Sequence, residues 1–133
     1  MTTDLKSDGT VLGGELAALM GIRFIELTAE RAVATMPVAG HRQVTGRLHG
    51  GAHCVLAETV GSMAANVHAG PDRVAVGVDI NATHTRGVED GHVTAVCTAV
   101  HLGSSLTVHE VAINDSRGHR LSTARITNAI IAR

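Results

Sequence analysis

The sequence predicts an α+β fold in which one long helix packs on a curved antiparallel sheet. Three observations support this prediction. The alanine-rich segment 52–68 is long enough for about five helical turns, and Gly61 is its only Gly or Pro. Several short runs alternate in side-chain character, as half-buried strands do. The connections between these runs are short and polar, which favours antiparallel pairing.

The first half of the chain is expected to contain a short helix, two strands and a polar loop, at residues 11–20, 22–27, 32–38 and 39–49. In the short helix, Leu12, Leu16 and Leu19 recur at helical spacing, and Gly21 is expected to end it. The turn Thr28-Ala29-Glu30 is expected to join the two strands.

The second half is expected to contain four strands, at residues 73–81, 93–102, 106–113 and 121–131. We interpret Glu89-Asp90-Gly91 as a hairpin turn between the first two strands and residues 114–118 as the turn between the last two. Val74, Val76, Val78 and Ile80 are expected to lie on one apolar face.

The composition indicates a single domain over residues 1–133, with residues 1–10 expected to form a flexible N-terminus. The formal charge is −1 and Phe24 is the only Phe, Tyr or Trp, so neither a basic surplus nor aromatic side chains favour a nucleic-acid partner. Charged residues make up only 17% of the chain, which suggests that another subunit covers part of its surface.

The sequence also predicts a cytoplasmic protein. The first ten residues lack the apolar stretch of a signal peptide, and no uncharged apolar run reaches the roughly 20 residues that a membrane span needs. Cys54 and Cys97 lie far apart and form no CxxC motif, so we expect two reduced thiols.

Glu58 is the only formally charged residue between Gly50 and Gly70, counting His as neutral. The helical wheel is apolar on one side and small on the other, which predicts a helix buried over most of its circumference. A desolvated carboxylate costs several kcal/mol unless it is paired, and such groups cluster at functional sites. The structural alternative is a Glu58 that reaches solvent or forms a salt bridge with an arginine.

His49-Gly50-Gly51 leads directly into this helix. Backbone N–H groups at a helix N-terminus can stabilise a developing oxyanion. Gly50 and Glu58 are eight positions apart, or about 12 Å of helix rise, which is too far for both to contact the same substrate atom. Either this segment folds back as a loop, or the Glu58 that meets it belongs to a second chain.

Two stretches resemble the hotdog-fold acyl-CoA thioesterases of the PaaI-like branch. This branch includes the 4-hydroxybenzoyl-CoA type with a catalytic Glu and the 1,4-dihydroxy-2-naphthoyl-CoA thioesterases. The matching residues are His49-Gly50-Gly51-Ala52 followed by LAETVGS at 56–62, and INATHTR at 80–86 followed by His101-Leu102-Gly103. The resemblance covers nearly the whole chain and departs at Gly87, where close relatives usually have Pro.

The resemblance implies homodimers that assemble into homotetramers, with each active site at a dimer interface. Glu58 would attack the thioester carbonyl or activate the attacking water, and the Gly50 N–H would be the oxyanion donor. Gln43 and His49 would orient or polarise the thioester, and Ser62 would hold a water. No cofactor is implied, because a thioester is already electrophilic and a thiolate is a fair leaving group.

The implied substrate-binding residues are Gly51, Met63, His84, Arg86, Gly103, Ser104 and Ser105. Arg86 suits phosphate oxygens of CoA. The alternatives are a solvated strand end and a hairpin turn, an ordinary loop amide at Gln43, and a Ser62 hydroxyl bonded back to the carbonyl of Glu58. Met63, Val67 and Val60 are expected to pack an aromatic or medium-size acyl group.

Other functions are less well supported by the residues. His49 and His53 have helical ligand spacing, but HExxH and a third clustered His are absent, so no metal is expected. A hydratase or dehydratase acting on acyl thioesters usually carries a His at the key position, where this chain has Glu58. A non-catalytic acyl-CoA-binding hotdog protein would have no need for that carboxylate.

Overall fold

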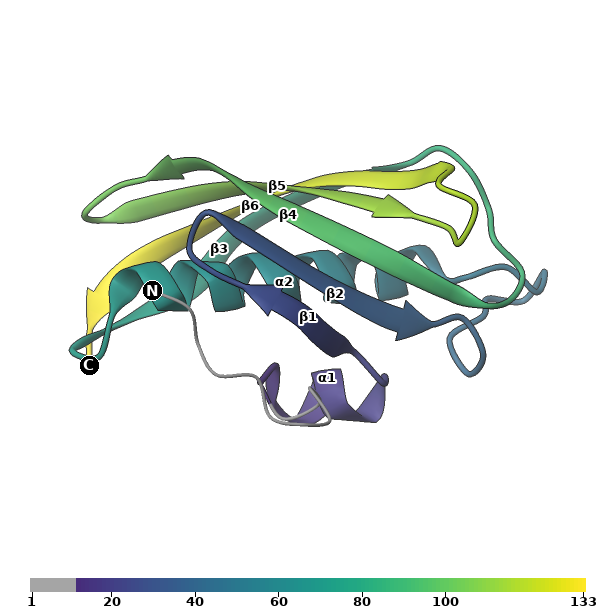
Figure 1. The fold of residues 1–133 in the computed structure, drawn as a ribbon, viewed down its shortest axis with the longest axis horizontal. Helices are drawn as coiled ribbons and strands as arrows, with labels where there is room; N and C mark the ends of the chain where they lie inside the picture. Colours follow the sequence, from purple (N-terminus) through teal and green to yellow (C-terminus); the bar gives the residue numbers. More distant parts are fainter. Residues whose placement is uncertain (1–11) are drawn as a thin grey trace.

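All the predicted helices and strands are present in the structure, a computed structural model that describes residues 12–133 (Figure 1). They are α1 (Gly14–Leu19), β1 (Arg23–Leu27), β2 (Arg31–Pro37), α2 (Gly50–Ala69), β3 (Arg73–His84), β4 (His92–Leu102), β5 (Leu106–Asn114) and β6 (Arg120–Ala132). The N-terminus expected to be flexible, residues 1–10, lies outside the described residues.

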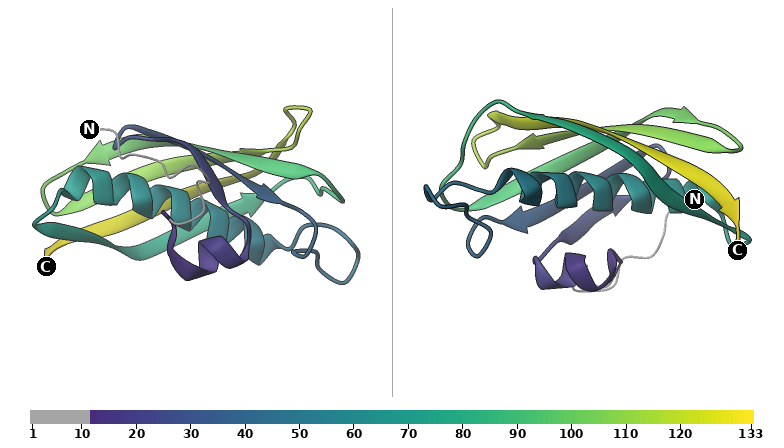
Figure 2. Two further views of the ribbon diagram at one scale, coloured as in Figure 1. Left: turned by 60° about the horizontal axis from the view of Figure 1, so that its bottom comes forward. Right: turned by 180° about the vertical axis from the view of Figure 1, so that it is seen from behind.

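The strands form one antiparallel sheet in the order β1-β2-β4-β5-β6-β3. The sheet curves over α2, which lies along its inner face (Figure 1; Figure 2). Helix α2 packs against β2, β3, β4, β5 and β6. Its side chains therefore form the centre of the core, in which Leu56, Val60 and Ile126 are fully buried. Burial of each such side chain contributes roughly 1.5–3 kcal/mol.

The small residues of α2 face the sheet. Ala57, Gly61 and Ala65 are buried, whereas Val55 and Met63 are only half-buried. A Cβ on Gly61 would lie 3.1 Å from the side chain of Ile126, so the helix approaches the sheet too closely for a larger residue. Of the larger apolar residues of α2, Leu56 and Val60 are thus fully in the core and Val55 and Met63 only partly.

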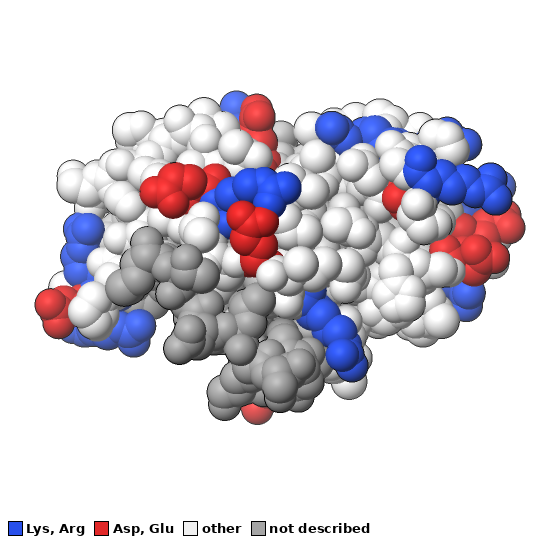
Figure 3. Space-filling model, in the orientation of Figure 1, with Lys and Arg blue, Asp and Glu red and all other residues white. Residues whose placement is uncertain are grey.

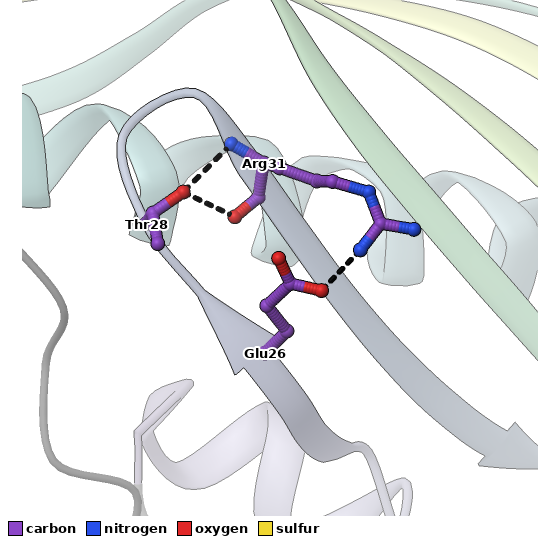
Figure 4. Close-up of polar contacts among 3 residues, drawn as sticks. All are labelled: Glu26, Thr28 and Arg31. Atoms are coloured by element: carbon purple, nitrogen blue, oxygen red, sulfur yellow. Dashed lines mark hydrogen bonds and ion pairs between the residues drawn. The ribbon is translucent and has the colours of Figure 1, made fainter.

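The turn between β1 and β2 agrees with the prediction at Thr28-Ala29-Glu30 (Figure 4). Thr28 Oγ1 accepts a hydrogen bond of 2.9 Å from the Arg31 N–H and donates one of 2.8 Å to the Arg31 carbonyl. Arg31 also forms an ion pair with Glu26 across the hairpin. The loop is therefore held by side chains within the turn itself and places β1 at one edge of the sheet.

The predicted hairpin at Glu89-Asp90-Gly91 is wrong. Strand β3 pairs with β6 at the far edge of the sheet, while β4 lies between β2 and β5. Gly91 has a positive φ, as a turn residue should, but its carbonyl accepts a hydrogen bond from Val38 N–H at the end of β2. The chain does turn at Gly91, but β4, the strand that follows, pairs with β2 and β5 and not with β3. The turn at residues 114–118 does join β5 to β6, as predicted.

Strand β3 leaves an apolar surface at the open edge of the sheet. Val76 and Val78 are exposed rather than packed on the core, and a β-bulge separates Gly77 from Asp79. Beyond the bulge, Ile80 packs against the core, so the predicted apolar face is divided and only its Val76 and Val78 part is left uncovered by this single chain. On the face shown in Figure 3, acidic and basic side chains lie in a few groups, and most of the described surface between them carries neither. Among the described residues, no helix has the length and apolar character needed to cross a membrane.

Candidate active site

The N-terminus of α2 presents backbone N–H groups beside a histidine cap. His49 is the N-cap, and its Nδ1 accepts a hydrogen bond of 2.8 Å from the Gly51 N–H. Within residues 12–133, the Gly50 N–H donates to no other group. A Cβ on Gly50 would lie 2.9 Å from Nε2 of His84, so any larger residue here would have to displace the His84 ring at the end of β3.

Gly50 shares a cavity of about 310 Å³ with three other predicted site residues, Gln43, His84 and Arg86. The cavity is lined without any acidic side chain and also contains Arg47 and His53. It therefore suits anionic or oxyanionic groups. Oε1 of Gln43 accepts a hydrogen bond of 2.8 Å from the Thr45 hydroxyl, which ties this amide to its own loop.

His53 is a buried neighbour of this cavity whose place there the sequence did not indicate. Its ring stacks on His84 with centroids 5.0 Å apart, and His84 Nδ1 lies 2.9 Å from the Ser122 hydroxyl. Burial, and secondarily the charge of His84, lower the pKa of His53 to about 4. At neutral pH His53 is therefore uncharged, and its buried ring can hold the exposed His84 ring beside Gly50.

Glu58 lies on the open side of α2, which corrects the expectation that its carboxylate is desolvated. It is exposed in the single chain, because the sheet covers only the opposite side of the helix. It lines a cavity of about 340 Å³ together with Ser62, Met63 and Cys54. Neither ion pair between described residues includes it, so the arginine salt bridge considered above is not formed. Burial and then the charge of Glu58 raise the pKa of the Cys54 thiol.

Ser62 follows Glu58 by one helical turn, and its hydroxyl donates a hydrogen bond of 3.0 Å to Oδ1 of Asn128 on β6. This bond replaces the bond back to the Glu58 carbonyl that the sequence left open. Sequence reasoning missed Asn128, although a signal existed. It occupies a core-facing position of β6 between Ile126 and Ile130, where a polar side chain needs a partner.

A single chain does not bring the predicted site residues together. Gly50 and Glu58 line different cavities, and His49 and Gly51 line a third, of about 420 Å³. The turn at 103–105 lies at the C-terminal end of α2, where His68 Nε2 is 2.8 Å from the Gly103 carbonyl. Arg86 lies at the N-terminal end, and a helix of 20 residues is about 30 Å long. The two groups of expected CoA contacts therefore lie at opposite ends of the molecule.

Comparison with known proteins adds to this geometry. A model of the thioesterase superfamily matches residues 45–122. The 1,4-dihydroxy-2-naphthoyl-CoA hydrolase of Escherichia coli is 39% identical over 119 residues, which are 89% of this chain and 88% of that protein. The proofreading thioesterase EntH of Cronobacter turicensis is 40% identical over 119 residues, or 89% of this chain and 87% of that one. The crystal structure of a mutant thioesterase from Pseudomonas aeruginosa superposes with a TM-score of 0.92 at 36% identity, covering 100% of this chain and 97% of that one.

Proposed function

Because this chain belongs to the thioesterase superfamily and is a thioester hydrolase with the hotdog fold, we propose that it cleaves acyl-CoA thioesters into a free acid and CoA. The observation that carries the proposal is the Glu58 carboxylate, which forms no ion pair with another described residue and lines a cavity from the middle of the central helix. We place the protein in the PaaI-like branch, on the motifs at 49–62 and 80–86, and we propose a cytoplasmic location.

In the proposed reaction, Glu58 acts on a thioester carbonyl that is held at the N-terminus of an α2 helix. As a general base, Glu58 takes a proton from water while the water oxygen attacks the carbonyl carbon. The carbon–sulfur bond then breaks, and the CoA thiolate leaves and takes up the proton. As a nucleophile, Glu58 would instead form an acyl anhydride that water hydrolyses. A positioned general base contributes roughly 10²–10⁴ in rate.

The Gly50 N–H is the proposed oxyanion donor. It is unbonded among the described residues and lines a cavity without acidic side chains. Such donors stabilise a developing oxyanion by roughly 3–4 kcal/mol each. In this proposal Gln43 and His49 orient or polarise the thioester. His49 already caps the helix, which fixes the N–H groups beside Gly50.

We propose that the active site forms between two subunits of a homodimer, with Glu58 of one chain facing Gly50 of the partner subunit. Two features of the single chain support this arrangement. Gly50 and Glu58 are too far apart to act together within one helix, and the apolar edge of β3 beside Glu58 is bare. Covering the β3 edge at Gly77, beside Glu58, in an interface would also exclude water around the carboxylate. We further expect the homodimers to pair into homotetramers.

The same arrangement would reunite the two groups of CoA contacts. His84 and Arg86 lie near the start of α2, and Gly103, Ser104 and Ser105 lie near its end. Two antiparallel helices would bring one group from each subunit to the same end of the dimer. Arg86 is exposed and free of ion pairs among the described residues, as a phosphate-binding guanidinium should be.

We propose an aromatic or medium-size acyl group, as the name of the Escherichia coli relative also suggests. Met63 lines the Glu58 cavity, where Leu16 of α1 and Val55 add apolar surface. Val60, which we expected to contact the acyl group, is fully buried in the core and cannot do so. The acyl pocket therefore involves α1 as well as α2.

The decisive test is a hydrolysis screen over aromatic, short-chain and long-chain acyl-CoAs with wild type, Glu58→Gln and Glu58→Ala. We expect both variants to lose at least about 100-fold in kcat, because the base or nucleophile is removed. Glu110→Gln, an exposed carboxylate on β5, serves as the matched control and should retain wild-type kcat. Unchanged turnover in Glu58→Ala would refute the mechanism. CoA binding without hydrolysis of any thioester would instead indicate a binding protein.

A further inference from the structure

Asn128 is a buried polar residue that the mechanism described above does not use. It is 0% exposed, and its Oδ1 accepts the hydrogen bond of 3.0 Å from the Ser62 hydroxyl. Its Nδ2 has no hydrogen-bond partner among residues 12–133. Burying an amide costs free energy unless the amide is hydrogen-bonded. The bond to Ser62 therefore offsets part of the cost of burying Asn128.

Asn128 also lies close to the Glu58 carboxylate. Gly77 of β3 is directly opposite Asn128 of β6 in the strand register. A Cβ added to Gly77 would lie 3.6 Å from Oε2 of Glu58 and 3.8 Å from Oδ1 of Asn128. The carboxylate and the amide therefore flank the same point of β3, beside the bulge that interrupts the strand after Gly77.

The hydrogen bond to Asn128 determines what the Ser62 hydroxyl can do in the cavity. A serine hydroxyl has one proton to donate and two lone pairs that accept. Because Ser62 donates its proton to Asn128, it faces the cavity as an acceptor, as an ionised Glu58 also does. Residues four apart on a helix have Cβ atoms about 5–6 Å apart, a span that one water can bridge.

We propose that Asn128 is a positioning residue that makes Ser62 an acceptor, so that Ser62 and Glu58 together orient the attacking water. The water donates one hydrogen to Ser62 and the other to Glu58, which leaves an oxygen lone pair free to attack the carbonyl. The C–O bond forms as the proton on the Glu58 side passes to the carboxylate, and the CoA thiolate leaves. This inference rests on the proposed hydrolysis and favours the general-base role of Glu58.

The test compares Asn128→Leu, Ser62→Ala and the double variant in kcat, KM and melting temperature. The substrate is an acyl-CoA that the wild type hydrolyses. Thr107→Val is the matched control, because Thr107 is buried directly opposite Asn128 on β5 and its hydroxyl has no partner among the described residues. Thr107→Val should retain wild-type kcat and KM.

We expect Asn128→Leu to lower kcat about tenfold with KM within about twofold, the effect of losing one hydrogen bond in the transition state alone. Ser62→Ala should show a similar loss, and the double variant no further loss, because Asn128 acts through Ser62. The melting temperature of Asn128→Leu should change little, because the substitution also removes the unpaired Nδ2.

The proposal would be overturned if the loss of kcat in the double variant equalled the product of the losses in the two single variants. It would also be overturned if Asn128→Leu had a lower melting temperature but an unchanged kcat. Asn128→Ser, whose shorter side chain no longer reaches Ser62, gives the same test if Asn128→Leu does not fold. The proposed function is judged separately. An active Glu58→Gln would refute hydrolysis by Glu58, whereas an inactive Glu58→Gln beside a fully active Asn128→Leu would refute only the role of Asn128.

Discussion

The two sides of α2 differ in their surroundings: one packs against the sheet, and the other lines a cavity. On the closed side, Ala57, Gly61 and Ala65 touch the sheet, and packing sets their size. On the open side, Glu58 and Ser62 line a cavity beside a bare strand edge. A substitution on the closed side should act on stability, and one on the open side on assembly and chemistry. The residues that determine stability and the residues proposed for catalysis thus lie on opposite sides of the same helix.

The largest expected effect is at the strand edge next to the open side. Val78→Lys should prevent dimer formation and lower kcat at least about 100-fold, because Glu58 would lose the oxyanion donor of the partner subunit. Light scattering gives the molecular mass, and steady-state kinetics give kcat. Val100→Lys is the control, because Val100 on β4 is 58% exposed, as is Val78. Equal losses in the two variants would argue against a dimer through β3.

A substitution on the closed side should change stability instead. Gly61→Val places a branched side chain where a Cβ already lies 3.1 Å from Ile126. We expect it to lower the free energy of unfolding by about 3 kcal/mol, measured by urea denaturation. Cys54→Val on the open side should change that free energy by less than about 1 kcal/mol. Comparable costs at both positions would contradict the difference between the two sides.

The smallest expected effect is a pH dependence from His53, which is buried at the N-terminal end of α2. Its pKa falls from 6.5 to about 4 in the folded chain. Below pH 6.5 the unfolded chain therefore binds a proton that the folded chain does not bind until about pH 4. The contribution of the neutral His53 side chain to the free energy of unfolding is complete above pH 6.5 and is lost as the pH falls from 6.5 to 4.

Wild type should accordingly lose about 2 kcal/mol from this residue between pH 7 and pH 5. His53→Gln removes the titrating group, so its free energy of unfolding should fall less over the same range. Denaturant titrations at both pH values measure the difference. Identical pH dependence in the two proteins would show that the folded chain binds a proton at His53 as readily as the unfolded chain does, so that folding does not lower this pKa.

The helices and strands could be predicted because each depends on neighbouring residues. The alternation in residues 73–81 predicted β3 correctly, but not its apolar face. Val76 and Val78 are exposed, whereas Ile80, beyond the bulge after Gly77, packs against the core. Glu89-Asp90-Gly91 was expected to pair β3 with β4, but these strands are not neighbours, because strand order depends on contacts between residues far apart in the sequence. Local pattern contains no information of that kind.

The candidate site was predictable to a similar degree. The sequence indicated Glu58 because it is the one charged residue of its helix, but it could not reveal that the carboxylate is exposed in a single chain. The contact between Ser62 and Asn128 joins residues 66 positions apart and required the fold to be known. The same holds for the stack of His53 on His84, which depends on where β3 ends.

The distance between Gly50 and Glu58 along α2 has a consequence for how the protein works at low abundance. If neither chain holds a complete set of reacting groups, specific activity falls on dilution even though every molecule remains folded. Catalysis then follows the association equilibrium as well as the amount of protein. A cell could adjust its output of free acid by changing the concentration of this chain, without any small-molecule effector.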